Sequence, residues 1–181
     1  MTLQALERFL LDGRRYQIVG GIGIGMVNPK RLGLEPTYVS SACWRGYIST
    51  YALQGKQLVL EELAVALYEL RRDLHEPGRS PYEPRVGPEI NGIQPHILEQ
   101  EVAFFNNVYR ELRLPAPFTG NLVIADDSVD AGWQLGRHRP PWAYRKVIDL
   151  YFFRGNLFYA RFWSLHAVVL RFLTLKWERR K

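Results

Sequence analysis

The sequence predicts an α+β fold built from two αβββα-like halves related by internal duplication, with antiparallel sheets covered by helices. Three observations support this prediction. Each half opens with apolar residues at helical spacing, each half contains alternating segments that meet at a glycine turn, and the two halves match at a fixed offset. The length of 181 residues suits one domain.

The internal match joins residues 18–58 to residues 118–158 at a constant offset of 100 positions. The identical pairs are Gly20/Gly120, Ile24/Ile124, Arg45/Arg145, Ile48/Ile148, Tyr51/Tyr151 and Gly55/Gly155. Because these identities fall in predicted strands and turns, we interpret them as an internal duplication. The single domain, residues 1–181, then divides into a first repeat at 1–74, a proline-rich connection at 75–95 and a second repeat at 96–181.

The first repeat is expected to begin with a helix, because Leu3, Leu6 and Leu10 recur at helical spacing before a glycine. Alternating apolar residues then predict strands, and Gly55 marks a tight turn between two of them. A leucine stripe predicts a second helix. The expected elements are a helix at 3–10, strands at 16–25, 43–53 and 57–60, and a helix at 60–74.

The second repeat is expected to follow the same plan, with Gly155 at the turn of its hairpin. The expected elements are a helix at 97–112, strands at 118–125, 143–153 and 157–159, and a helix at 161–179. For this last segment a continued strand is the alternative, since Val168 and Val169 are β-branched. The alternative architecture for the whole chain is a more closed β-barrel, in which some of these helices are strands.

The connection at 75–95 carries five prolines and three glycines and is longer than most loops inside a compact domain. It is either a functional lid or the join left by the duplication, and we favour the join.

The chain composition indicates a cytoplasmic protein. Cys43 is the single cysteine, which excludes a disulfide within the chain and suits a reducing compartment. The first 15 residues contain Glu7 and Asp12 and no long apolar stretch, so no signal peptide is predicted. The longest apolar region, 157–175, is interrupted by charged residues, so no transmembrane segment is predicted either.

Positive charge is concentrated in the C-terminal third. Residues 1–100 hold 11 basic and 11 acidic residues, whereas residues 137–181 hold 11 basic and two acidic residues, a net charge of +9. Such asymmetry favours an anionic partner. The alternative is a solvated face that only keeps the protein soluble.

The glycine-rich run from Gly20 to Gly25 resembles a phosphate-binding loop, but its context differs. A phosphate loop leads from a strand into a helix, and here Met26 and Pro29 follow with no helical pattern. Gly21, Gly23 and Gly25 instead recur at the period of a strand. We therefore predict that another element approaches this strand closely.

Three aspartates, Asp126, Asp127 and Asp130, follow a predicted strand and are the residues on which a metal-dependent hydrolase or nuclease would depend. The simpler interpretation, which we favour, is an aspartate-rich turn. The four histidines lack metal-ligand spacing, and no serine-nucleophile motif is present. No catalytic residue, metal site or cofactor is predicted.

The most informative cluster combines cations and aromatic rings from Arg137 to Lys146, and the matching strand of the first repeat repeats the combination. Cations neutralise phosphates or carboxylates, and aromatic rings stack on unpaired bases. Equally, Arg145 could pair with Asp149, Arg45 could pair with an acid elsewhere, and the aromatic residues Trp44 and Tyr144 could belong to the core. The predicted binding residues are Trp44, Arg45, Arg137, His138, Arg139, Trp142, Tyr144, Arg145 and Lys146, with Arg45 and Arg145 lining one site.

We therefore expect a non-enzymatic binding protein rather than an enzyme. Its first expected partner is an acidic protein, which it would bind as an adaptor or as an immunity-type inhibitor of a toxin. The alternative is a nucleic acid bound by the same basic and aromatic surface. The aspartate-based hydrolase is the third hypothesis.

Overall fold

The computed structural model describes residues 4–38, 40–70, 82–98, 104–128 and 144–163. In these residues the chain is nearly all β, so the predicted α+β class with covering helices is wrong. The elements are β1 (Arg8–Leu11), β2 (Arg14–Ile24), the 3-10 helix η1 (Pro29–Leu32), β3 (Tyr47–Gln54), β4 (Gln57–Val65), β5 (Tyr68–Leu70), β6 (Tyr82–Pro84), β7 (His96–Ile97), β8 (Asn107–Tyr109), β9 (Leu114–Pro115), β10 (Thr119–Ser128), β11 (Tyr144–Phe153) and β12 (Asn156–Trp163).

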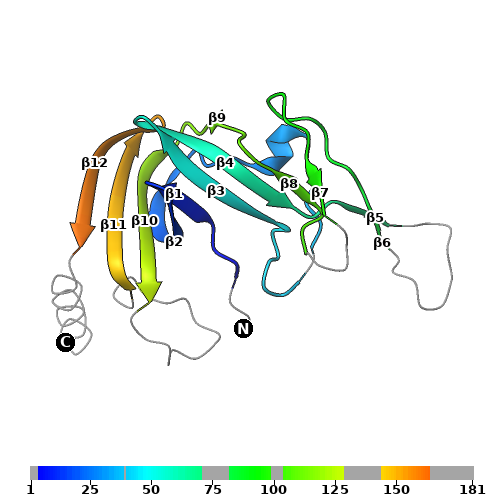
Figure 1. Cartoon of the computed structure of the whole chain (residues 1–181), viewed down its shortest axis with the longest axis horizontal. Helices are drawn as coiled ribbons and strands as arrows, with labels where there is room; N and C mark the ends of the chain where they lie inside the picture. Colours follow the sequence, from blue (N-terminus) through cyan, green and yellow to red (C-terminus); the bar gives the residue numbers. More distant parts are fainter. Residues whose placement is uncertain (1–3, 39, 71–81, 99–103, 129–143, 164–181) are drawn as a thin grey trace.

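One ten-stranded sheet contains most of these strands, in the order β12-β11-β10-β2-β1-β3-β4-β8-β7, with β9 paired to β4. Figure 1 shows β12, β11 and β10 side by side on one side of the molecule, while β3 and β4 run towards the other. The sheet bends back on itself at the two hairpin turns, where Asn156 pairs with Gln57 and the Leu58 amide donates to the Gly155 carbonyl at 2.7 Å.

The main core lies on the inner side of this bent sheet. It includes Phe9 from β1, Tyr51 from β3, Leu60 from β4 and Phe152 from β11, all at most 1% exposed. Strands distant in sequence therefore bury their apolar side chains in one common core, and this burial is the main stabilising contribution to the fold.

The predicted helix at 3–10 is wrong because its second half is β1. This strand lies between β2 and β3 and pairs with both, antiparallel to β2 and parallel to β3. A short apolar run fits helical and extended periods alike, and here the hydrogen bonds to two neighbouring strands determine the outcome.

The other three predicted helices are also wrong, because the structure has strands in the described parts of these segments. Residues 60–65 continue β4, in which Leu58, Val59 and Leu60 are all buried. A strand buried on both faces gives a nearly continuous apolar run, which periodicity does not separate from a helix. Within 97–112 the chain forms β7 and β8, and the first three residues of 161–179 end β12 while the rest lies outside the described residues.

The predicted strands and both hairpins are present. β3 and β4 meet at Gly55, and β11 and β12 meet at Arg154 and Gly155. Both residues of the second turn have positive φ, 48° and 81°, which is the pattern of a type I′ turn. Both predicted architectures contain these hairpins; only the alternative also makes some of the predicted helices strands, as at 8–10 and 60–65.

The close approach predicted at the glycine run is confirmed by β10, which pairs antiparallel with β2. A Cβ added at Gly23 would lie 2.5 Å from the Phe118 ring. The absence of a side chain at Gly23 therefore leaves room for this ring in the core. Gly21 on β2 and Gly120 on β10 each lie against the backbone of the other strand, and each has a φ of 147°. The run is therefore a packing feature of the sheet.

Candidate binding face

The hairpin of β11 and β12 presents a positive surface. Its exposed charged side chains are Arg145, Lys146, Arg154 and Arg161. Its single acid, Asp149, is 5% exposed and accepts a hydrogen bond of 2.9 Å from the Trp163 indole through Oδ2. Because the acid is buried and the cations are not, the hairpin attracts anions.

A row of paired residues crosses four strands on the outer side of the sheet. Ile22 of β2 pairs with Asn121 of β10, which pairs with Tyr151 of β11, which pairs with Tyr159 of β12. Directly paired residues project from the same side of a sheet, so these side chains are neighbours. The ring centroids of Tyr151 and Tyr159 lie 5.5 Å apart, and that of Phe158 lies 6.3 Å from Tyr151.

Large apolar side chains on this side are open to solvent. Ile22 is 84% exposed, Phe153 58%, Phe158 68% and Tyr159 53%. A contiguous exposed apolar patch on a protein surface usually marks a site of interaction. We call the patch the aromatic face, and its members are Ile22, Tyr151, Phe153, Phe158 and Tyr159.

Two arginines lie over aromatic rings at the ends of the aromatic face. The Arg154 guanidinium carbon is 5.4 Å from the centroid of Phe153, at the hairpin turn. The Arg161 guanidinium carbon is 4.1 Å from the centroid of Trp163, further along β12. Both contacts are cation–π interactions, which hold the planar guanidinium groups at the surface beside the exposed rings.

The predicted site residues of the second repeat fall into different environments. Tyr144 is 4% exposed and packs with Ala125 and Val147 in a small second cluster, so its ring is part of the interior. Arg145 and Lys146 are exposed at the start of β11. The remaining members of the predicted cluster, Arg137, His138, Arg139 and Trp142, lie outside the described residues.

Arg45, two residues before β3, contacts three other residues of the chain through its guanidinium group. It forms an ion pair of 3.0 Å with Glu7, donates to the Ala5 carbonyl at 3.1 Å, and lies 5.2 Å from the Tyr47 ring centroid. Burial raises the pKa of Glu7, and the attraction of Arg45, which lowers it, offsets this effect only in part. The alternative interpretation, that Arg45 pairs with an acid elsewhere, describes this contact.

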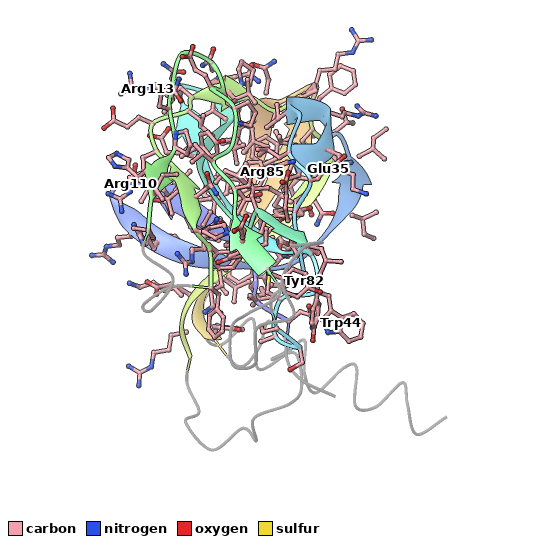
Figure 2. The ribbon with its side chains drawn as sticks, turned by 90° about the vertical axis from the view of Figure 1, so that its right-hand side faces the viewer. Glu35, Trp44, Tyr82, Arg85, Arg110 and Arg113 are labelled. Carbon is pink, nitrogen blue, oxygen red and sulfur yellow. The ribbon has the colours of Figure 1, made fainter. Side chains whose placement is uncertain are left out.

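Trp44 is a surface residue rather than a core residue. It is 65% exposed, and Figure 2 shows its side chain projecting from the ribbon. β11 and the strand that follows Arg45 are not neighbours: β12 and β4 lie between them on one side, and β10, β2 and β1 on the other. Arg45 is held against Glu7 and Ala5, just before β1. The structure therefore does not bring Arg45 and Arg145 together in one site.

The aspartate cluster is only partly described. Asp126 is half-buried in β10, the side chain of Asp127 is not described, and Asp130 lies outside the described residues. Within the described ranges, no group of three or more His, Cys, Asp or Glu side chains is placed to hold a metal ion. The metal-dependent hydrolase therefore stays a prediction.

Sequence reasoning missed the aromatic face and its two arginines. The signal was the run of consecutive aromatic residues on both arms of the hairpin, Phe152-Phe153 and Phe158-Tyr159. Consecutive residues of a regular strand project from opposite faces, so one ring of such a pair is expected on the outer face. The register of β11 and β12 shifts beside Phe158, and there both rings of the pair are exposed.

Comparison with models of protein families, with curated proteins and with solved structures finds no match. In the part of the chain that the structure describes, no helix has the length and apolar character needed to cross a membrane.

Proposed function

We propose that the chain is a non-enzymatic binding protein that contacts an anionic macromolecule through the aromatic face and the arginines beside it. The observation that carries this proposal is the contrast within one hairpin. The rings of Phe153, Phe158 and Tyr159 and all four cations are exposed, whereas the single acid is buried and hydrogen-bonded to Trp163. Exposed aromatic and arginine side chains are enriched where binding energy is concentrated.

The chemistry of the hairpin suits both partner classes expected from the sequence, an acidic protein and a nucleic acid. Arginine binds carboxylates and phosphates with the same planar set of donors. Arg154 lies over the exposed ring of Phe153, and Arg161 lies over the half-buried ring of Trp163. Their removal should therefore weaken binding to any polyanion that uses this face.

The double variant Arg154→Ala/Arg161→Ala is expected to elute from immobilised heparin at a clearly lower salt concentration than the parent. The matched control is Arg110→Ala/Arg113→Ala, which removes the same charge from exposed arginines that project from the β8 and β9 side (Figure 2). Figure 1 shows β8 and β12 on opposite sides of the molecule. Net charge falls equally in both variants, so only a local binding face separates them.

Equal shifts for the two double variants would contradict the proposal, because they would show that retention follows net charge alone. A larger shift for Arg110→Ala/Arg113→Ala would place the anion-binding surface near β8 and β9, on the opposite side of the molecule.

A further inference from the structure

We infer that the anionic partner is single-stranded nucleic acid, with unpaired bases stacking on the aromatic face and phosphates contacting Arg154 and Arg161. This inference rests on the proposed function and names its partner class. Two kinds of observation carry it: the arrangement of exposed rings across neighbouring strands, and the placement of cations at both ends of that arrangement.

The rings form a platform rather than isolated contacts. Tyr151 and Tyr159 are directly paired across β11 and β12, and Phe158 lies beside them. Neighbouring strands are about 4.8 Å apart, so the rings stand close together on a sheet surface. Every base has a flat π face, and aromatic residues on an open sheet stack successive bases without needing a particular sequence.

The cations are placed where a backbone that follows β12 would pass. Arg154 is at the hairpin turn beside Phe153. Arg161 projects from the same side of β12 as Tyr159, because their paired residues on β11, Asp149 and Tyr151, are two positions apart. The strand from Asn156 to Arg161 spans about 17 Å. A stretch of this length with a cation near each end matches a short run of phosphates over a stacking platform.

The same observations favour a single strand over the other candidates. In a duplex the bases are stacked on each other and present only their edges in the grooves, so exposed rings gain little. An acidic protein would pair its carboxylates with the arginines but offers Phe158 and Tyr159 no regular series of flat rings, which successive unpaired bases provide. Single-stranded nucleic acid satisfies the rings and the cations together.

The test is fluorescence anisotropy with a labelled 15-residue oligothymidylate, titrated at several salt concentrations. The variant Phe158→Ala/Tyr159→Ala is expected to bind about tenfold more weakly or worse, because two stacking rings are removed, and to keep the parent's salt dependence. The matched control Tyr38→Ala/Phe104→Ala removes a tyrosine and a phenylalanine of similar exposure, 61% and 68%, from other parts of the chain and should bind like the parent.

The arginine variant should behave differently from the ring variant. Arg154→Ala/Arg161→Ala is expected to weaken binding and to reduce the slope of log affinity against log salt by about 1.4, or about 0.7 for each phosphate that an arginine no longer neutralises. Circular dichroism of each variant checks that the fold is retained. A ring variant that binds oligothymidylate as tightly as the parent would overturn the inference.

Three further outcomes separate this inference from the proposed function. Equal affinity for a duplex of the same length would overturn the inference, because a duplex offers no free base faces. Binding to heparin and polyglutamate without binding to oligothymidylate would also overturn it, while leaving the proposed function and favouring an acidic protein. Absence of binding to all three polyanions would contradict both.

Discussion

Replacement of Gly120 by alanine is expected to lower the free energy of unfolding by about 4 kcal/mol. Gly120 has a backbone φ of 147°, which L-residues other than glycine rarely adopt. An added Cβ would also meet the backbone carbonyl oxygen of Ile22 on the neighbouring strand. Strain and collision therefore add, and neither is relieved by rotating a side chain. Equilibrium urea unfolding followed by circular dichroism measures the effect.

The matched control is Gly20→Ala in the same pair of strands. There the added Cβ would lie 3.8 Å from Val123, which is ordinary van der Waals contact, and φ is not in the region that favours glycine. We expect its unfolding free energy to stay within about 1 kcal/mol of the parent. If both variants were destabilised by the same amount, the close approach of β2 and β10 would not be the cause.

Replacement of Asn106 by alanine is expected to cost about 3 kcal/mol of unfolding free energy. This side chain is 1% exposed; its Oδ1 accepts from the Leu67 amide at 2.8 Å, and its Nδ2 donates to the Leu67 carbonyl at 2.8 Å. Just beyond the end of β4 it thereby gives the Leu67 amide its acceptor, whereas the Leu67 carbonyl also accepts from the Arg85 amide at 2.9 Å. Alanine leaves the buried Leu67 amide without a partner, which is strongly unfavourable away from water.

Asn121→Ala is the matched control for Asn106→Ala. Its Oδ1 also accepts from a backbone amide, that of Ile22 at 3.1 Å, but this hydrogen bond is exposed, and water replaces it when the side chain is removed. We expect a decrease of less than about 1 kcal/mol, measured by the same urea titration. A decrease at Asn106 as small as that at Asn121 would contradict the assigned role of burial.

The hairpins were predictable from the sequence because their signals are local. Gly55 and Gly155 occupy turn positions with positive φ, and alternating residues on either side pair with their nearest neighbours in sequence. The helices were predicted wrongly because the decisive contacts are distant. β1 is a strand because β2 and β3 lie on either side of it, and the run Leu58 to Leu60 is extended because both of its faces are covered.

The candidate site was predictable in part. The sequence places the excess of positive charge in the C-terminal third, and Arg145 and Lys146 are exposed there. It does not give the face from which a ring projects, which depends on strand register. Tyr144 was expected at the binding surface and is buried, whereas the aromatic face depends on a row that joins Ile22 to Tyr159 across four strands.

The most direct test of the binding face is nuclear magnetic resonance mapping of backbone amides during titration with the 15-residue oligothymidylate. We expect the largest chemical-shift changes on β11 and β12 between Tyr151 and Arg161 and at Ile22, with little change on β7 and β8. Changes centred on Trp44 and Arg45, with β11 and β12 unaffected, would contradict the proposed binding face.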